Sequence, residues 1–298
     1  MVQDVAHARA TDLIARDVLI HVPGFASGRT TARASKLYGG TVNTSYRVET
    51  SAGRFVVRLH DPEAVALGAD HEREAQLHAA AAAAGLAPAL IHVDATHRFM
   101  IMEYVAGQLW TSQDFGRADR LQQLGGALHT LHTLTAPVVA PFDVWAVLER
   151  HYRRLREVPE EAADFAALMR RAAETLQACG TQQRAKAFVH NDVHHSNLIG
   201  SERLYLLDWE YAAVADPLFD LACILTYYPQ AADHAEALLD STRLAGAATP
   251  EMLRETTWLW MLVSYFWYRA RRLAGPATPA EMATEHSLRQ RLDLPDRA

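Results

Sequence analysis

Apolar and polar positions alternate in the first third of the chain, and this alternation predicts antiparallel strands. In the segment RFVVRLH, the apolar residues Phe55, Val57 and Leu59 recur at every second position. Side chains two residues apart point to the same face of a strand, so this period indicates a sheet with one buried face. Gly39 and Gly53 lie at the breaks between this segment and the two that precede it, SKLYGG and TSYRVET.

The next stretch, DHEREAQLHAAAAAAGLAP, predicts a single helix. It is rich in alanine, glutamate and leucine, which are strong helix formers, and it ends at Gly85. The apolar segment that follows predicts a buried strand over residues 99–104. Because the composition becomes helical after this strand, we place a domain boundary there. It separates a sheet-and-helix domain of residues 1–104 from a mostly helical domain of residues 105–298.

The pattern of the second domain is helical, with one short pair of strands inside it. Leucines recur at helical spacing at Leu121, Leu124, Leu128 and Leu131, and further helices are predicted near 142–156 and 161–179. The segments NLIG and RLYLLD predict two strands joined by a tight turn. A hairpin returns the chain to its starting point, so Asn197 and Asp208 are expected to lie side by side.

Two chemical interpretations fit the segment VHNDVHHSNLIG. In one, a metallohydrolase site, a transition metal is bound by His190, Asp192, His194 and His195. In the other, Asp192 takes a proton from a hydroxyl, while Asn197 and Asp208 offer hard oxygen ligands to Mg²⁺. The order H-x-D-x-x-x-x-N, hairpin, Asp favours the second interpretation, because it is the catalytic arrangement of kinases.

The composition narrows the choice of function. A formal net charge of −6 gives no basic face for nucleic acid, although it is compatible with small cationic substrates. Only Cys179 and Cys223 occur, which is too few for a disulfide framework. The N-terminus lacks a targeting pattern, and no apolar run reaches the about 20 residues that span a bilayer. We therefore expect a cytoplasmic protein without a nucleic-acid or membrane partner.

The order of these motifs, with a Gly-Gly break between the first strands, resembles that of the choline/ethanolamine kinase and aminoglycoside phosphotransferase superfamily. The resemblance extends from Lys36 to Arg271. It implies an α+β, two-lobed protein-kinase-like fold with an N-terminal antiparallel sheet and a mostly helical C-terminal lobe. The segment DWEYAAVADPLFDLA is most similar to bacterial choline, ethanolamine and thiamine kinases.

The resemblance implies that the first domain binds ATP. The segment LYGGTVNTSYRV is similar to the family's nucleotide loop, although it is not the G-x-G-x-x-G of protein kinases. The loop residues expected to face the phosphates are Gly39, Gly40, Thr41 and Asn43. The segment IMEYVAG resembles the hinge, where main-chain groups from Glu103 to Val105 would hydrogen-bond adenine.

Arg58 stands where protein kinases carry a strand lysine. The resemblance implies that it contacts phosphate oxygens, whereas the residue alone would indicate a strand-end arginine with a solvated head. An acidic residue on the following helix would pair with it. We favour Glu74 over Glu72 for this role.

The resemblance also assigns the remaining site residues. Asp192 would be the catalytic residue that aligns the acceptor hydroxyl, with His190 bracing its loop, and Asn197 and Asp208 would hold Mg²⁺. Asp220 would support the catalytic loop from the following helix. Aromatic residues at helical spacing are usually core, but choline kinases build a cation-binding cage in this region. The expected acceptor-binding residues are Glu210, Trp260, Trp267 and Tyr268.

These expectations describe an ATP- and Mg²⁺-dependent kinase that phosphorylates the hydroxyl of a small cationic alcohol. Choline or ethanolamine is the first choice of acceptor, thiamine the second and an aminoglycoside the third. A nucleotide-binding pseudoenzyme is the alternative from another class, and the joint presence of Asp192, Asn197 and Asp208 argues against it. The sequence leaves open the oligomeric state and whether one or two metal ions bind.

Overall fold

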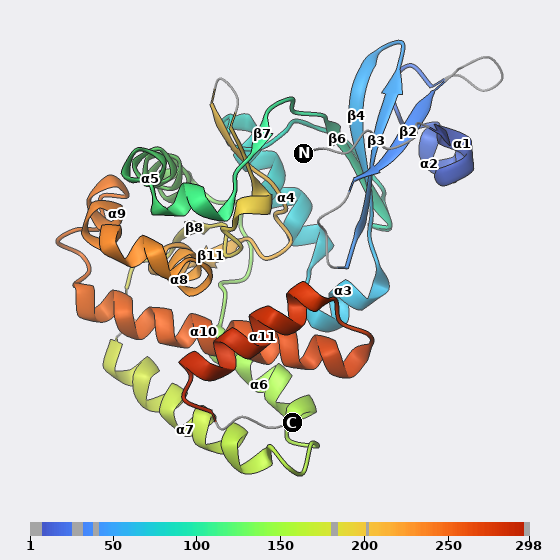
Figure 1. The fold of residues 1–298 in the computed structure, drawn as a ribbon. Coiled ribbons are helices and arrows are strands. Elements are labelled where there is room, and N and C mark those ends of the chain that lie inside the picture. Colours follow the sequence, from blue (N-terminus) through green and yellow to red (C-terminus); the bar gives the residue numbers. More distant parts are fainter. Residues whose placement is uncertain (1–7, 26–31, 38–41, 180–183, 201–202, 295–298) are drawn as a thin grey trace. The chain divides into compact units, whose positions relative to one another are not determined.

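The computed structural model describes residues 8–25, 32–37, 42–179, 184–200 and 203–294 (Figure 1). The chain forms two compact units. The first comprises Met1–Trp110 and Ser196–Glu210, and the second comprises Thr111–His195 and Tyr211–Ala298. The segment from Ser196 to Glu210 thus belongs to the same unit as the N-terminal residues. The division of functions at residue 104 stays a prediction.

The first unit contains an antiparallel sheet with the strand order β1-β2-β3-β4-β6-β5. Its described strands are β1 (Ala8–Arg9), β2 (Arg33–Leu37), β3 (Thr44–Thr50), β4 (Gly53–Leu59), β5 (Leu90–Val93) and β6 (Phe99–Glu103). The predicted strands in TSYRVET and RFVVRLH are β3 and β4, which pair with Val48 opposite Phe55. Val48 and Val57 are completely buried, as the alternating pattern requires.

Two short helices, α1 (Ala10–Leu13) and α2 (Arg16–Leu19), pack against this sheet (Figure 1). Ile14 and Leu19 belong to one apolar cluster with Val48, Phe55 and other sheet residues. These helices were not predicted, because four residues are too few to show a helical period.

The predicted alanine-rich helix is α4 (His71–Ala83), which follows the short helix α3 (Pro62–Leu67). The side chain of Asp70 caps α4 by accepting a hydrogen bond from the Arg73 N–H at 3.0 Å. The helix ends before Gly85, whose φ of 75° is the left-handed conformation that glycine adopts without strain. Both ends of α4 are therefore set by local sequence signals.

The predicted hairpin is confirmed as β9 (Leu198–Gly200) and β10 (Leu204–Leu206), with Leu198 opposite Leu206. The turn residues 201–202 lie outside the described part. A third strand, β7 (Gln108–Leu109), pairs with β9. In addition, the Leu206 N–H donates to the Leu86 carbonyl at 2.8 Å, which ties the hairpin to the turn after α4. These contacts explain why the hairpin belongs to the first unit.

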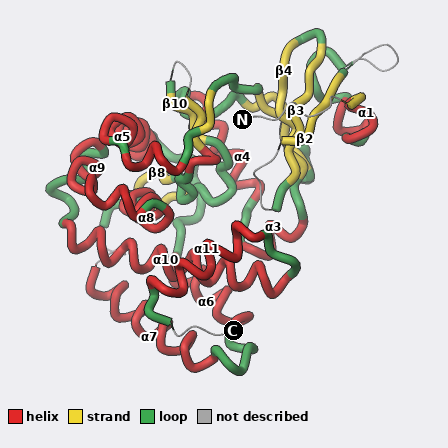
Figure 2. The backbone as a smooth tube through the Cα atoms, viewed as in Figure 1, coloured by secondary structure: helices red, strands yellow, loops and turns green. Residues whose placement is uncertain are grey.

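The second unit is mostly helical (Figure 2). Its described helices are η1 (Ser112–Gly116), α5 (Ala118–Thr133), α6 (Val144–Leu155), α7 (Ala162–Cys179), α8 (Leu218–Tyr227), η3 (Pro229–His234), α9 (Ala235–Ser241), α10 (Pro250–Ala274) and α11 (Pro279–Arg291). Two strands, β8 (Ala187–Val189) and β11 (Ala213–Ala215), pair antiparallel, and a short turn of helix, η2 (His195–Asn197), links the two units in sequence.

The helices predicted from the leucine spacing and near 142–156 and 161–179 are confirmed as α5, α6 and α7. Leu121, Leu124, Leu128 and Leu131 are all at most 1% exposed. None of the helices in the described ranges is long and apolar enough to cross a membrane. The expected α+β fold class, an antiparallel sheet followed by a largely helical remainder, is confirmed.

Adjacent glycines in α5 allow a test of helix packing in the second unit. An added Cβ at Gly125 would lie 1.9 Å from Ser241 Oγ and 2.6 Å from Ser241 Cβ of α9, whereas a Cβ at Gly126 would meet no atom within 4 Å. We expect Gly126→Ala to stabilise the protein by about 0.5–1 kcal/mol, through helix propensity alone. Gly125→Ala should destabilise it by about 1–3 kcal/mol, because it overpacks the contact with α9. Chemical denaturation of both variants measures this difference, and equal effects would contradict the packing described.

Candidate active site

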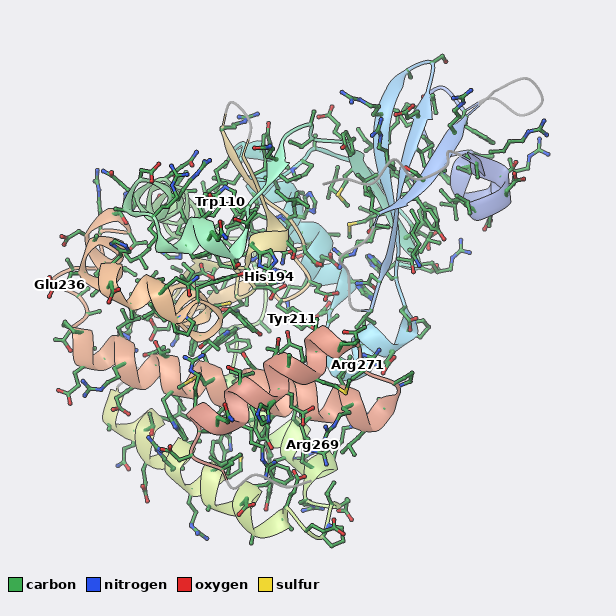
Figure 3. All side chains as sticks on the ribbon, viewed as in Figure 1. Trp110, His194, Tyr211, Glu236, Arg269 and Arg271 are labelled. Carbon is green, nitrogen blue, oxygen red and sulfur yellow. The ribbon has the colours of Figure 1, made fainter. Side chains whose placement is uncertain are left out.

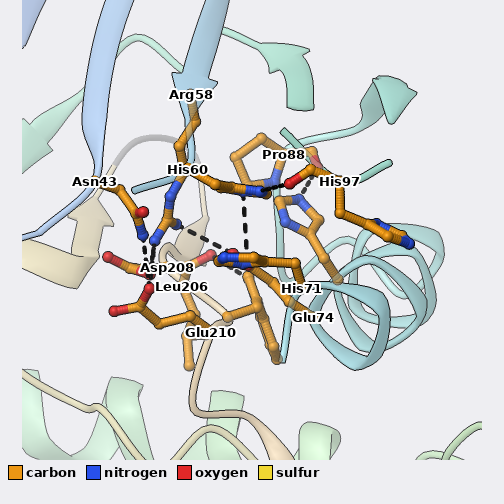
Figure 4. A network of polar contacts seen from close by, with 12 residues as sticks. Asn43, Arg58, His60, His71, Glu74, Pro88, His97, Leu206, Asp208 and Glu210 are labelled. Carbon is orange, nitrogen blue, oxygen red and sulfur yellow. Dashed lines mark hydrogen bonds and ion pairs between the residues drawn. The ribbon is translucent and has the colours of Figure 1, made fainter. Parts of the chain in front are cut away.

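A buried arginine is the centre of the polar network in the first unit (Figure 4). Arg58 extends from β4 and is 6% exposed. Its Nη1 lies 3.2 Å from Glu74 Oε1, and its Nη2 lies 2.7 Å from Asp208 Oδ1 and 3.1 Å from Glu210 Oε2. The predicted partner on α4 is thus Glu74, which is completely buried, whereas Glu72 is exposed.

The charges in this network do not balance. One guanidinium faces three carboxylates, so the group carries an excess of negative charge when all three are ionised. Burial opposes ionisation of Arg58, but Asp208, Glu74 and Glu210 raise its pKa above the usual value. Burial likewise opposes ionisation of Glu74, but Arg58 lowers the pKa of this carboxyl to about 2. The Arg58–Glu74 pair is therefore ionised at neutral pH, and Asp208 and Glu210 share the same guanidinium.

Asn43 joins the predicted nucleotide loop to this network. Its Nδ2 donates to Glu210 Oε2 at 2.7 Å, and its Oδ1 accepts from the Asp61 N–H at 2.9 Å. The other loop residues with an expected phosphate role, Gly39, Gly40 and Thr41, lie outside the described residues. The position of Glu210 is therefore defined by Arg58 and Asn43, both of which were expected at the nucleotide.

The predicted metal ligands are adjacent across the hairpin. The Leu207 N–H donates to the Asn197 carbonyl at 2.8 Å, which places the backbone of Asn197 beside that of Leu207 and Asp208. Asp208 has a φ of 63°, a left-handed conformation in which aspartate is enriched. The neighbouring Trp209 is completely buried, and its Nε1–H donates to the Leu206 carbonyl at 3.1 Å. This anchor fixes the turn that carries Asp208.

This set of donors fits Mg²⁺. Magnesium prefers one or two carboxylates, and it would offset the excess negative charge around Arg58. The Asp208 side chain is 28% exposed, whereas those of Glu74 and Glu210 are 0% and 7% exposed, so Asp208 is the most accessible of the three carboxylates. Asp208, with Asn197 beside it, is therefore the part of the network best suited to hold a metal ion together with solvent or phosphate oxygens.

The predicted hinge follows β6. The Glu103 N–H donates to the Ala89 carbonyl at 2.9 Å, and the Tyr104 N–H donates to the Arg54 carbonyl at 3.1 Å. These two donors are occupied by the sheet, so an adenine contact at Glu103 would have to use its carbonyl group. Val105 is the first residue of the segment beyond these hydrogen bonds.

In the second unit, Asp220 organises the segment that contains Asp192. Asp220 is completely buried, and its Oδ1 accepts from the His190 N–H at 3.1 Å and from the Asn191 N–H at 2.7 Å. Its Oδ2 lies 2.8 Å from His132 Nε2. A residue that supports the catalytic loop must hold its backbone, and Asp220 does so through these hydrogen bonds. They hold Asn191 in a left-handed conformation with a φ of 62°.

Histidines surround Asp192, but the contacts in the structure do not form the metal site considered as an alternative. His190 Nδ1 accepts from the Asp192 N–H at 3.3 Å, and His195 Nδ1 lies 2.7 Å from the Tyr228 hydroxyl. His194, labelled in Figure 3, has its Nε2 3.3 Å from Asp192 Oδ2. Within the described part of the chain, the ligating atoms of these residues do not converge on one point. The metallohydrolase interpretation is therefore not supported.

Aromatic side chains connect the Asp192 segment with α10. Asn191 Nδ2 donates to the Tyr211 carbonyl at 3.2 Å, and Trp267 Nε1 donates to the Tyr211 hydroxyl at 3.0 Å. The Tyr227 hydroxyl donates to Ser264 Oγ at 3.2 Å. Burial, and secondarily the negative charge of Asp192, raises the pKa of Tyr268, so its hydroxyl is neutral at physiological pH.

The three aromatic residues expected at the acceptor differ in their surroundings. Trp260 is 6% exposed and packs against Phe142 and Phe219, with ring centroids 6.2 and 5.3 Å away. Trp267 and Tyr268 are half-buried and contact each other edge to face at 4.9 Å. Trp260 thus has the environment of a core residue, whereas Trp267 and Tyr268 are only partly buried.

Three features of these networks were not predicted. Asn43 was expected to face phosphate but not to bind Glu210, and Tyr211 and Tyr227 were not singled out. Tyr211 directly follows the DWE segment, and Tyr227 is the last residue of α8. Their positions depend on contacts with α10 that no local sequence pattern records.

Comparison with known proteins finds a relative that is similar over about two thirds of the chain. Protein LicA of Haemophilus influenzae is 27% identical over 210 residues, which cover 68% of this chain and 60% of LicA. The chain thus matches less than two thirds of the length of that relative.

Solved structures share the fold. A choline/ethanolamine kinase family protein from Mesorhizobium loti has a TM-score of 0.74 and 23% identity, covering 94% of this chain and 92% of that one. Choline kinase LicA from Streptococcus pneumoniae has a TM-score of 0.74 and 19% identity, covering 87% and 92%. A spectinomycin phosphotransferase in complex with ADP and spectinomycin has a TM-score of 0.57 and 13% identity, covering 87% and 88%. These likenesses support the protein-kinase-like fold.

The family itself follows from the sequence profile of the phosphotransferase enzyme family, which matches residues 33–256. This range includes Arg58, Asp192, Asn197 and Asp208, and it spans more than half of the chain. The superfamily resemblance stated from the motifs is confirmed. The chain belongs to the phosphotransferase enzyme family.

Proposed function

We propose that this protein is an ATP- and Mg²⁺-dependent kinase that transfers the γ-phosphate to the hydroxyl of a small cationic alcohol. The observation that carries the proposal is the network of Arg58 with Glu74, Asp208 and Glu210. A buried cation with an excess of carboxylates, in a chain of this family, is suited to binding a nucleotide phosphate through a divalent metal ion.

The first unit would bind the nucleotide. Asn197 and Asp208 would hold Mg²⁺, which neutralises charge on the phosphate oxygens when bound. Arg58, kept in place by Glu74, would contact phosphate oxygens directly. The hydrogen bonds of Glu210 with Arg58 and Asn43 support a role beside Asp208 more strongly than the acceptor-binding role expected from the resemblance.

The second unit would align the acceptor. The Asp192 carboxylate would accept a hydrogen bond from the acceptor hydroxyl and take its proton as the oxygen bonds to phosphorus. Asp220 and His190 would maintain the backbone conformation that this requires. Catalysis would come mainly from positioning and charge neutralisation, since phosphoryl transfer requires little covalent chemistry from the protein.

The aromatic residues near Asp192 favour an acceptor with a compact cation. A quaternary ammonium group cannot donate hydrogen bonds, so a site for it must use ring faces and nearby carboxylates. Trp267 and Tyr268 would supply ring faces, with Asp192 as the nearby carboxylate. Choline or ethanolamine is the first choice and thiamine the second, while an aminoglycoside would need many more carboxylates for its several ammonium groups. The names choline/ethanolamine kinase and choline kinase carried by the two structures of TM-score 0.74 support this order.

Measurement of ADP release with a panel of alcohols tests the proposal. Wild-type protein should release ADP with choline, ethanolamine or thiamine. The release of ADP should stop in EDTA and resume when Mg²⁺ is restored. A nucleotide-binding pseudoenzyme would bind MgADP but release no ADP with any alcohol. Turnover of an aminoglycoside with none of the three smaller alcohols would overturn the acceptor assignment and leave the phosphotransfer mechanism intact.

Asp192→Asn tests the role of the catalytic carboxylate. The amide keeps the size of the side chain but cannot take a proton, so we expect kcat to fall by a factor on the order of 10²–10⁴. MgADP affinity should be almost unchanged. Steady-state kinetics and calorimetry measure the two effects. An Asp192→Asn variant with wild-type kcat would exclude Asp192 as the catalytic residue.

Trp267 offers a test of the acceptor site with a matched control. Removal of one cation–π contact is expected to cost about 0.5–2 kcal/mol, so Trp267→Ala should raise the acceptor KM by a factor of about 2–30. The KM for ATP should stay the same. Trp267→Phe retains a ring face and should restore most of the acceptor affinity. An equal loss in both variants, or a parallel increase in the ATP KM, would argue that Trp267 only supports the Tyr211 hydroxyl.

A further inference from the structure

Two histidines next to Glu74, His60 and His71, form a stacked pair in the first unit (Figure 4). The ring centroids of His60 and His71 are 3.8 Å apart, and their planes differ by 8°. His71 Nδ1 lies 3.2 Å from Glu74 Oε2, and His60 Nε2 lies 3.8 Å from the same oxygen. The pair therefore contacts the carboxylate that holds Arg58, on the oxygen opposite to the one that faces the guanidinium.

Hydrogen bonding defines the tautomer of His60. Its Nδ1 is 2.7 Å from the His97 carbonyl oxygen, which can only accept, so Nδ1 carries the proton. Burial lowers the pKa of His60 to about 4, and the ring is therefore neutral at physiological pH. Its Nε2 then carries a lone pair, which cannot hydrogen-bond to a carboxylate oxygen. His60 thus acts on Glu74 through the ring of His71 that it stacks against.

His60, His71 and Glu74 could in principle hold a metal ion, because their ligating atoms lie within 4.8 Å of one another. The ring geometry disfavours this function. An imidazole binds a metal along the lone pair in its ring plane, at about 2 Å. An ion placed between two nearly parallel, stacked rings would lie well outside both planes. A hydrogen bond from His71 to Glu74 is therefore the better account of the cluster.

Glu74 needs this hydrogen bond because it has no access to water. Its side chain is completely buried, and a buried carboxylate is costly unless its oxygens have partners. Oε1 faces Arg58 and Oε2 faces His71, so the carboxylate is held in one orientation. Without the His71 donor, Glu74 would be free to turn, and the guanidinium could pair more fully with Asp208.

We propose that His71, held by the stacked ring of His60, is a positioning residue that keeps Glu74 directed at Arg58 and so leaves Asp208 and Glu210 available to a metal-bound nucleotide. This inference rests on the proposed function. It gives a role to His60 and His71, to which the sequence motifs assigned none, and this role is exerted only through the nucleotide site.

Two substitutions separate the hydrogen bond from the ring. His71→Phe keeps the stacked ring and removes the donor, whereas His71→Asn keeps a donor near the Nδ1 position and removes most of the ring. We expect His71→Phe to raise the KM for MgATP about tenfold, which is the loss expected for one hydrogen bond to a charged group, and to change the acceptor KM by less than about twofold. His71→Asn should stay within about threefold of the wild-type MgATP KM.

Melting temperature and active fraction, measured beside the KM values, distinguish a positioning role of His71 from general damage to the fold. A purely structural role would lower the melting temperature and the active fraction but leave both KM values unchanged, and that result would overturn the inference. If His71→Phe does not fold, His60→Asn removes the stacked ring and keeps the donor to His97. It should raise the MgATP KM in the same direction by a smaller factor, and an unchanged value would also overturn the inference.

Calorimetry with MgADP tests the role of His71 separately from the proposed kinase activity. If the wild-type protein transfers no phosphate but binds MgADP, weaker binding by His71→Phe supports the role of His71, and equal binding overturns it. A wild-type protein that binds no MgADP would overturn both proposals. Binding of one Zn²⁺ by the wild-type protein that is lost in His71→Phe would overturn the positioning role in favour of a metal site.

Discussion

The candidate site depends on the constraint that a buried charge must have partners. Arg58 is almost inaccessible to solvent, and three carboxylates surround its guanidinium. They come from two parts of the chain: Glu74 from α4, and Asp208 and Glu210 from either side of the buried Trp209. Because desolvation of an unpaired guanidinium would cost several kcal/mol, the strand, the helix and the segment after the hairpin must come together for the first unit to fold.

The second unit uses the same principle around a buried anion. Asp220 accepts two backbone N–H groups and contacts His132, which satisfies its charge and holds the residues before Asp192 in place. Asn191 and Asp208 both adopt left-handed backbone conformations, one beside the candidate catalytic residue and one at the candidate metal ligand. Strained backbone of this kind persists only where surrounding contacts over-determine it, as Asp220 and Trp209 do here.

The sequence was sufficient to predict β3, β4, β6, the hairpin and the helices from α4 to α7, because strand alternation, helix propensity and turn signals are local. The hairpin followed from two short apolar segments, and it brought the backbones of Asn197 and Asp208 together as expected. By contrast, the buried side of α4 includes His71, Glu74 and His78 beside Leu77 and Ala81, so apolar residues alone do not mark its inner side. The histidine pair could have been suspected, since His60 is two residues after Arg58 and His71 three before Glu74. Their contact with one oxygen of Glu74 depends on how α4 packs on the sheet, which spacing alone does not reveal.

We propose that tight binding of ATP depends on a divalent cation, because of the excess of carboxylates around Arg58. Calorimetric titration of the wild-type protein with ATP, with Mg²⁺ present and in EDTA, tests it most directly. We predict that ATP binds in the presence of Mg²⁺ and that its affinity falls by at least about tenfold in EDTA, because Asp208 and Glu210 then repel the phosphates. Equal affinity in the two conditions would contradict the account, since Arg58 alone would then be sufficient to hold the nucleotide.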